Sequence, residues 1–449
     1  MSGKTIFSSE SSAYGIIART WMPLALNWLM MALEGPILVG LLGHLPDPTH
    51  NLAAFSVAFS IALIVEAPVM MLLSTSAALG TDQVRYERLW RFASWLAIPL
   101  SALMGLIGIP LIFHRINRAL WHLPPELAER VAGAVWLLIP WPAAIAYRRL
   151  WQGILIRFGR SRLVAWGTVL RLVGIVAGAG VGLGFTSWPG AWIAALALSA
   201  GVVSEMIAVR FWASPTLKHM PISQGEALTY RKILDFYLPL LLTSILNVAL
   251  TPLLTLLIAQ GTHPILSLAA YSPTTSTVFL FSCVGVAYQE VVIVLLGTRV
   301  GPKLVPFAHR IALMAVVGLA VLLISVVHEL WFGRLYDLPP EVRALTWGGV
   351  WCMLPMPAII VYLAYLKGYF IWAHQTRVNF LSALIEIAAV GALASLLLFG
   401  VKMTALYGAL LGLLIARVIT LLTLYRLLLW TSGQENRKLP ERSPQLERL

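Results

Sequence analysis

The chain has 449 residues and a formal net charge of +13; 59% of its residues are hydrophobic and only 11% are charged. Soluble proteins carry about 25% charged residues, so most of this surface cannot face water. The composition excludes a soluble enzyme, a disordered scaffold and a nucleic-acid-binding domain, and it predicts an all-α integral membrane protein. The two cysteines, Cys283 and Cys352, lie in apolar stretches without metal-ligand spacing, and the histidines show no paired ligand spacing, so we expect no metal site. The sequence also lacks a Walker A motif and the full dinucleotide-binding spacing, so we expect no cofactor.

Twelve segments are long and apolar enough to cross a membrane. A bilayer core about 30 Å thick requires roughly 20 mostly apolar residues per helix. The N-terminal segment before Gly15 is polar and precedes no short apolar segment with a cleavage site, so we expect no cleaved signal peptide. The predicted spans are 18–43, 52–80, 92–113, 131–156, 163–184, 190–210, 234–260, 266–297, 306–328, 345–373, 379–401 and 405–430.

The basic residues predict how these spans are oriented. One set of span ends carries 24 of the 32 Lys and Arg residues, with Arg148, Arg149 and Lys367 counted among them, and the opposite ends carry six. Loops rich in Lys and Arg remain in the cytoplasm. We therefore expect a protein of the plasma (cytoplasmic) membrane with both termini in the cytoplasm. Two further arginines, Arg171 and Arg417, fall inside spans.

The chain contains an internal repeat. Leu52-Ala53-Ala54-Phe55 returns in the second half as Leu268-Ala269-Ala270-Tyr271, and Leu123-Pro124-Pro125-Glu126 returns at nearly the same offset as Leu338-Pro339-Pro340-Glu341. Each copy holds six spans, and an even number gives two parallel repeats related by an axis along the membrane normal. The predicted units are a first lobe (1–210), a cytoplasmic connector (211–232), a second lobe (233–430) and a cytoplasmic tail (431–449).

Carboxylates inside the spans are the first candidates for a functional site, because ionisable groups in a membrane cost about 2.5–3.5 kcal/mol each. Glu34 and Glu66 lie within the first two spans, and Glu290 lies in the eighth. A buried carboxylate can exchange a proton or ligate Na⁺, so we expect H⁺ or Na⁺ as the coupling ion. The alternative for Glu34 and Glu66 is a structural hydrogen bond or a local thinning of the bilayer, and the alternatives for Glu290 are a role in the cavity and a role in packing. Glu205 is interpreted as an ordinary group near the inner interface.

Arg171 and Glu386 occupy equivalent positions in the two copies, and Arg417 lies in the middle of the last span. The opposite charges of Arg171 and Glu386 either meet across the lobes or serve one lobe each, and Arg417 needs a counter-charge. A buried arginine binds carboxylate or phosphate well. Arg171 and Arg417 are therefore candidates for holding an anionic substrate, and structural Arg–Glu pairs are the alternative.

Prolines inside the spans predict kinks, because proline removes a backbone hydrogen bond. Matched kinks suggest bends that gate access, and static kinks are the alternative. The candidates are Pro36, Pro68, Pro140, Pro142, Pro252, Pro355 and Pro357.

Two stretches resemble known transporter families. Pro23, Val39-Gly40-Leu41-Leu42-Gly43 and Leu52-Ala53-Ala54-Phe55 resemble the first two helices of multidrug and toxic compound extrusion (MATE) transporters. The segment from Leu52 to Pro68, and the one from Pro142 through Gly153-Ile154-Leu155 to Leu163-Val164, resemble the progressive ankylosis (ANK) family. Both families belong to the multidrug/oligosaccharidyl-lipid/polysaccharide (MOP) flippase superfamily, and the resemblance implies a MATE-like fold and export.

The duplicated lobes with charged interiors favour a secondary active transporter working by alternating access. We expect an ion-coupled exporter of a small organic or anionic solute, which is not an enzyme and acts as a monomer in the lipid bilayer. The alternative is a flippase of a lipid-linked saccharide or similar phospho-lipid precursor. A non-transporting scaffold or receptor is disfavoured by the duplication and the short tail.

Overall fold

The computed structural model describes residues 4–160, 162–222, 228–373 and 375–438, and in these ranges it is helical with no β-strand. The first repeat contains α1 (Lys4–Ala32), α2 (Glu34–Gly43), α3 (Pro48–Glu66), η1 (Ala67–Val69), α4 (Leu72–Leu79), α5 (Gln83–Gly108), α6 (Pro110–Ala119), α7 (Pro125–Leu137), α8 (Pro140–Arg157), α9 (Arg162–Phe185) and α10 (Gly190–Lys218). The second repeat contains α11 (Tyr230–Val248), α12 (Leu250–Ala259), α13 (Pro264–Leu295), η2 (Gly301–Lys303), α14 (Leu304–Val321), α15 (Ser325–His328), η3 (Glu329–Leu335), α16 (Pro340–Cys352), α17 (Met356–Trp372), α18 (Thr376–Ser395), η4 (Leu396–Gly400) and α19 (Ala405–Lys438).

The helices account for the predicted membrane spans. Within the described ranges, eleven helices are long and apolar enough to cross a membrane, and α16 with α17, bent by 43°, form a twelfth when counted as one span. The fold class is therefore confirmed, and the protein is an integral membrane protein. The helix ends differ from the predicted units, since α10 extends to Lys218 within the predicted connector and α19 extends to Lys438 within the predicted tail. Residues 223–227 of the connector and 439–449 of the tail lie outside the described residues.

All seven proline candidates lie at helix breaks. Proline lacks the N–H that would bond the carbonyl four residues earlier. Consistent with this, α1 ends at Ala32, four residues before Pro36, and α11 ends at Val248, four residues before Pro252. The breaks before α8 and α17 fall at Pro140 with Pro142 and at Pro355 with Pro357, and Pro68 lies in η1 between α3 and α4. The kinks are thus present, and their role in gating stays a prediction.

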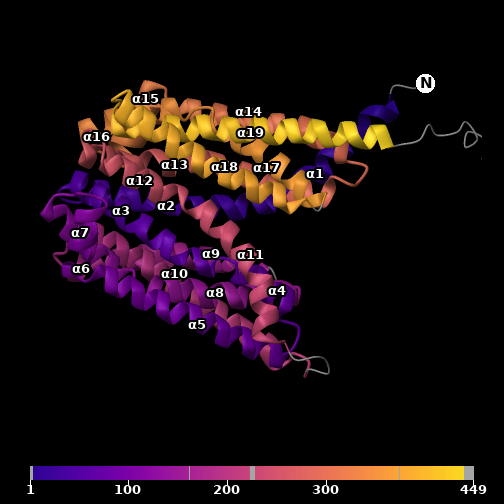
Figure 1. Ribbon diagram of the computed structural model, residues 1–449, viewed down its shortest axis with the longest axis horizontal. Coiled ribbons are helices and arrows are strands. Elements are labelled where there is room, and N and C mark those ends of the chain that lie inside the picture. The colour runs from indigo at the N-terminus through magenta and orange to yellow at the C-terminus, as the bar shows by residue number, and fades with distance from the viewer. Residues whose placement is uncertain (1–3, 161, 223–227, 374, 439–449) are drawn as a thin grey trace, which may run out of the picture.

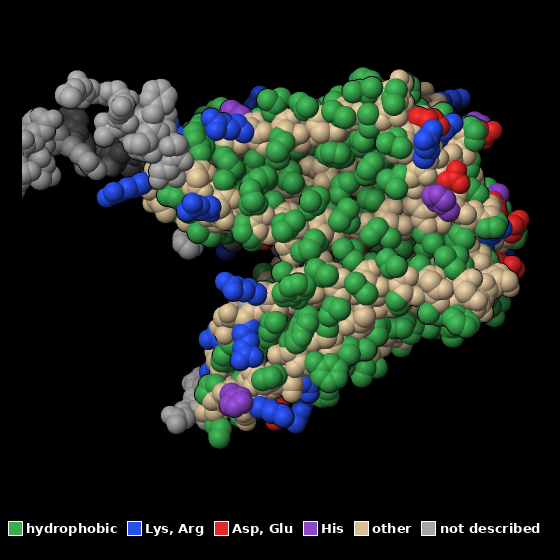
Figure 2. Space-filling model, turned by 180° about the vertical axis from the view of Figure 1, so that it is seen from behind, with side chains coloured by type: hydrophobic (Ala, Val, Ile, Leu, Met, Phe, Trp, Pro, Cys, Tyr) green, Lys and Arg blue, Asp and Glu red, His purple; other side chains and the backbone are tan. Residues whose placement is uncertain are grey.

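Two helical lobes form a V that is closed at one end and open at the other (Figure 1). Helices α3 to α10 build one arm and α12 to α19 build the other, and α2 packs on α3, α9 and α10 of the first arm while also touching α13 of the second. The open end of the V is where both described chain ends lie (Figure 1). Figure 2 shows the cleft between the arms, with Lys and Arg side chains on its rims and most visible acidic side chains at the closed end.

The first helix of each repeat packs on the opposite arm. In α1, Ile17 belongs to an apolar cluster with Tyr288 of the second repeat, and the Trp21 indole Nε1 donates to the carbonyl of Val284 at 3.0 Å. In α11, the Ser244 hydroxyl donates to the carbonyl of Ala67 at 3.1 Å, and the Tyr237 hydroxyl donates to the carbonyl of Pro68. The lobes in space therefore do not coincide with 1–210 and 233–430, because α1 and α11 exchange partners.

The closed end is held by close backbone contact between the arms. Gly43 at the end of α2 lies directly against the backbone of Tyr336, so that a Cβ there would lie 2.9 Å from the Tyr336 carbonyl carbon. Nearby, the Gln260 side chain donates to the carbonyl of Leu120 at 2.8 Å, and the Ser56 hydroxyl donates to the carbonyl of Leu268 at 3.0 Å. Only glycine allows this approach at position 43.

Candidate functional site

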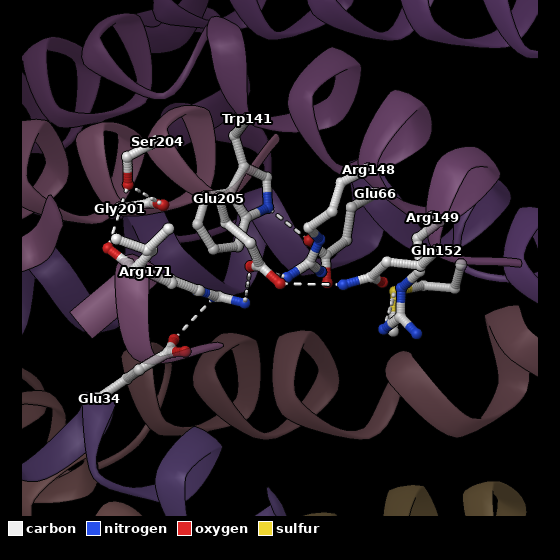
Figure 3. Close-up of polar contacts among 12 residues, drawn as sticks. Glu34, Glu66, Trp141, Arg148, Arg149, Gln152, Arg171, Gly201, Ser204 and Glu205 are labelled. Carbon is white, nitrogen blue, oxygen red and sulfur yellow. Dashed lines mark hydrogen bonds and ion pairs between the residues drawn. The ribbon is translucent and has the colours of Figure 1, made fainter. Parts of the chain in front are cut away.

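Charged side chains gather inside the first arm (Figure 3). Helix α8 supplies Trp141, Arg148 and Gln152, whose spacings of seven and four residues place them on one helix face. The facing helices supply the remaining charges: Glu34 from α2, Glu66 from α3, Arg171 from α9 and Glu205 from α10. We call these seven residues, together with Arg149 of α8, the first-lobe cluster.

Glu205 is the centre of this cluster, although sequence analysis placed it near the interface as an ordinary group. Its side chain is 1% exposed. It accepts hydrogen bonds from the Arg148 guanidinium and, at 2.9 Å, from the Gln152 amide, and an Arg171 nitrogen lies 3.9 Å away. The prediction was wrong because Glu205 lies thirteen residues, or about 20 Å, from the end of α10 at Lys218. The predicted span ended at residue 210, so the sequence placed Glu205 only five residues from a span end and gave no signal of this depth.

Arg171 connects Glu205 to Glu34. Its guanidinium lies 2.7 Å from a Glu34 carboxylate oxygen and 5.5 Å from the centroid of the Trp141 ring. The Trp141 indole N–H in turn donates to the Glu66 carboxylate. Glu66 is 4% exposed, and among the described residues no cation lies within ion-pair distance of it. The two predicted carboxylates are thus joined through one arginine and one indole, and only Glu34 is ion-paired.

Arg148 and Arg149 are part of this interior, whereas sequence analysis counted them at the inner span ends. They precede the end of α8 at Arg157 by nine and eight residues, which is about 12–14 Å of helix. Arg149 is half-buried, and its polar contact within the described ranges is with the Met70 sulfur at 3.5 Å. A guanidinium held away from carboxylates is free to bind an anion.

The second arm has a smaller charged cluster, formed by Arg417, Glu386 and Lys367, which we call the second-lobe cluster. The Arg417 Nε lies 3.0 Å from Glu386, the Lys367 ammonium lies 3.8 Å from the same carboxylate, and an Arg417 nitrogen lies 3.3 Å from the Met356 sulfur. Arg171 and Glu386 therefore serve one lobe each and do not meet, and Glu386 is the counter-charge that Arg417 requires. Lys367 was predicted to lie at the cytoplasmic ends of the spans, but it is part of the second-lobe cluster.

A cavity of about 350 Å³ lies where the two arms converge. Glu34 lines it from the first arm and Arg417 from the second. Most of the remaining wall is apolar or aromatic, including Phe55, Phe59, Leu63, Tyr271, Phe279, Met353 and Met356. The cavity therefore has an apolar body with a carboxylate on one wall and a guanidinium on the other.

Glu290 is not brought to this site. It lies five residues before the end of α13 at Leu295, and its side chain is exposed. It is absent from the cavity wall and from the first-lobe cluster. Among the described residues, no group of three or more His, Cys, Asp or Glu side chains is arranged to hold a metal ion.

No protein-family model matches the chain, and no curated protein matches it. Solved structures do match. A MATE family transporter of the MOP superfamily in its inward-facing conformation has a TM-score of 0.70 at 14% identity, with 93% of this chain and 98% of that chain covered. The chain has the MATE fold.

Two further solved structures of MOP superfamily transporters also match the chain. An outward-facing MATE structure has a TM-score of 0.61 at 15% identity and covers 93% of this chain and 95% of its own. A MOP superfamily transporter from Pyrococcus furiosus has a TM-score of 0.60 at 16% identity and the same coverage, and its binding pocket is described as having reverse polarity that suggests a different function. The chain thus shares its fold with structures described as inward-facing and as outward-facing.

Proposed function

We propose that the protein is a secondary active transporter that exports a small organic or anionic solute by alternating access, coupled to H⁺ or Na⁺. The observation that carries the proposal is the cavity at the convergence of two arms that are closed at one end and open at the other. Solutes can be exchanged between the two sides when such arms rock about a central site. The MATE fold supports this proposal.

The open end is proposed to face the cytoplasm. The Lys and Arg residues gather on the rims of the cleft at this end (Figure 2), and such residues are retained on the cytoplasmic side. The conformation is then inward-facing, with both termini in the cytoplasm, and solute enters the cavity from the cell interior.

Coupling is proposed to act through Glu34 and Glu66. Helix α2 begins at Glu34 and ends at Gly43, which seals the closed end against Tyr336. Protonation of Glu34, or binding of Na⁺ beside it, weakens the attraction between Glu34 and Arg171. The first turn of α2, which begins at Glu34, is then held less firmly against α9. Gly43 at the other end of the same short helix makes the contact with Tyr336 that closes the V. A change of charge at Glu34 therefore also changes the free-energy difference between the closed and open forms of this end. Glu66 is proposed to affect the Glu34–Arg171 ion pair indirectly. It accepts a hydrogen bond from Trp141, whose ring lies against the Arg171 guanidinium.

The test uses proteoliposomes with an imposed pH or Na⁺ gradient, with ethidium as the organic cation and carboxyfluorescein as the organic anion. We expect gradient-driven transport of at least one probe, a loss of tenfold or more in Glu34→Gln and Glu66→Gln, and retained transport in Glu290→Gln. Glu290 is a matched control because it is a carboxylate within a span but outside the cluster. Transport that is unchanged in both cluster variants would contradict the coupling proposal.

A phospho-lipid flippase is the second candidate, and Arg149 favours it. This guanidinium has no carboxylate partner among the described residues. In the second lobe, the two cations Arg417 and Lys367 share the single carboxylate of Glu386. Phosphate groups are recognised by such arginines. A flippase translocates a fluorescent phospholipid analogue across the vesicle bilayer, and Arg149→Ala, Arg171→Ala and Arg417→Ala abolish that movement. An exporter leaves the analogue in its original leaflet.

A further inference from the structure

An aromatic hollow of about 450 Å³ lies in the first arm near the open end of the V, apart from the central cavity. Helices α5, α8 and α10 each contribute two side chains four residues apart, which share a helix face. These pairs are Tyr86 with Trp90, Tyr147 with Trp151, and Met206 with Arg210, and Glu87 completes the wall.

The aromatic rings form an ordered row. The Trp90 and Tyr147 rings are stacked with centroids 6.4 Å apart, and the Tyr147 and Trp151 rings are stacked at 5.8 Å. Hydrogen bonds fix this row from behind, since the Tyr147 hydroxyl donates to the Ser94 hydroxyl at 2.9 Å and the Trp151 indole donates to the Tyr86 hydroxyl at 3.0 Å. The aromatic surface is therefore pre-organised.

The hollow carries one positive and one negative charge that do not pair with each other. The Arg210 guanidinium lies 5.4 Å from the centroid of the Trp151 ring, and Glu87 precedes Trp90 by one helical turn. Neither makes an ion pair with any side chain in the described ranges. Both are exposed, so a ligand can reach them. A singly charged ligand is attracted by one of these groups and repelled by the other, whereas a zwitterion can place its anionic group at Arg210 and its cationic group at Glu87. The two charges therefore favour a ligand that carries both.

The depth of the hollow matches a lipid headgroup. Arg210 lies eight residues from the end of α10, Trp151 six residues from the end of α8, and Glu87 four residues into α5. At 1.5 Å per residue, these positions are about 6–12 Å from the helix ends, where headgroups and tryptophan side chains meet. The second repeat has Leu366 and Tyr425 where the first has Trp151 and Arg210, so the fold itself does not require the hollow.

We propose that this hollow binds the headgroup of a zwitterionic phospholipid, with the amine against Trp90 and Glu87 and the phosphate at Arg210. Ammonium groups are attracted to aromatic faces, and arginine is suited to phosphate. The site is independent of the transport proposal, because it shares no residue with the cavity or with the first-lobe cluster.

The test measures lipid retention by native mass spectrometry on the full chain purified in detergent, with phosphatidylethanolamine, phosphatidylcholine or phosphatidylglycerol added. We expect a zwitterionic lipid to be retained about fivefold or more better than phosphatidylglycerol. Trp90→Ala, Glu87→Gln and Arg210→Ala remove this preference, while Trp90→Phe and Arg210→Lys keep most of it. Trp166→Ala is the matched control, since Trp166 is a tryptophan 62% exposed near the same end of α9.

Four outcomes overturn the assignment. The first is unchanged retention in all three disruptive variants, and the second is equal retention of phosphatidylglycerol with no effect of Glu87→Gln. The third uses glycerophosphoethanolamine as a soluble competitor. If it displaces the lipid at equal concentration, the ligand is a soluble metabolite and not the membrane lipid. The fourth is a loss of retention in Trp166→Ala to the same degree as in the disruptive variants.

Discussion

Adding a methyl group at Gly43 tests whether the closed end of the V is a seal. In Gly43→Ala, the new Cβ would lie 2.9 Å from the carbonyl carbon of Tyr336 and closer still to its oxygen, whereas ordinary contact begins at 3.4 Å. The neighbouring atoms belong to backbone and cannot rotate away. The two arms must therefore move apart at this point, or α2 must tilt.

The energetic cost follows from the packing of the contact. Overpacking a well-packed interior typically costs about 1–3 kcal/mol. Because the contact joins the two arms, this cost is borne by the state closed at this end and is relieved when the end opens. A shift of about 1–3 kcal/mol changes the ratio of the two states about 5- to 150-fold, which is large enough to measure.

The assay is thiol labelling of Ser272→Cys, a position on the cavity wall, in a background where Cys283 and Cys352 are replaced by alanine. A membrane-impermeant maleimide is applied separately to each side of oriented vesicles. The parent protein is labelled mainly from the Lys- and Arg-rich side, and Gly43→Ala gains at least fivefold in labelling rate from the opposite side. Gly184→Ala is the control, since a Cβ there meets nothing within 4 Å. An unchanged rate in Gly43→Ala, or an equal gain in Gly184→Ala, would refute the seal.

Three further predictions concern the buried charges. Arg171→Ala is expected to destabilise the protein by about 3–5 kcal/mol, because it leaves Glu34 unpaired, and adding Glu34→Ala should recover part of the lost midpoint in thermal unfolding in detergent; additive losses would contradict the pairing. Arg417→Ala should cost less than Arg171→Ala in the same assay, since Lys367 remains 3.8 Å from Glu386, and an equal or larger loss would contradict the compensation by lysine. Trp141→Phe removes the indole hydrogen bond to the Glu66 carboxylate, and a hydrogen bond to a charged group is worth about 1.5–3 kcal/mol. We expect the pH dependence of transport to shift while gel filtration shows a folded protein. An unchanged pH profile would mean that Glu66 takes no part in coupling.

The features predicted correctly from the sequence are those that depend on local chemistry. Span length depends on bilayer thickness and on the apolar residues of one segment. The twelve spans can therefore be predicted without knowing which helices pack against each other. The helix breaks at Pro36 and Pro252 follow from a missing N–H four residues after Ala32 and Val248. The repeat is legible because the same residues recur at a nearly constant offset.

The features that sequence analysis missed depend on how helices rotate and tilt against one another. Glu205 meets residues from α8 and α9, and its sequence neighbours contain no hint of Arg148 or Arg171 as partners. Its depth depends on the extension of α10 to Lys218, beyond the predicted span end at residue 210. For Arg148 and Arg149, by contrast, the predicted span 131–156 already places both residues seven or eight positions inside its end. The exchange of α1 and α11 between the arms has no such local signal, since the hydropathy of a helix does not specify the arm on which it packs.

The two ion pairs show how far the repeat symmetry extends. In the first arm the cation is Arg171 on α9 and the central anion is Glu205 on α10, while in the second arm the anion is Glu386 on α18 and the cation is Arg417 on α19. A buried pair requires only that the charges compensate each other, so the helices could exchange signs without loss of the fold. Of these paired residues only Arg417 lines the cavity, and the charge on the opposite wall comes from Glu34, the other partner of Arg171. The cavity therefore has opposite charges on its two walls, and in the proposed transporter we expect a solute with distinct charged ends to bind in one orientation.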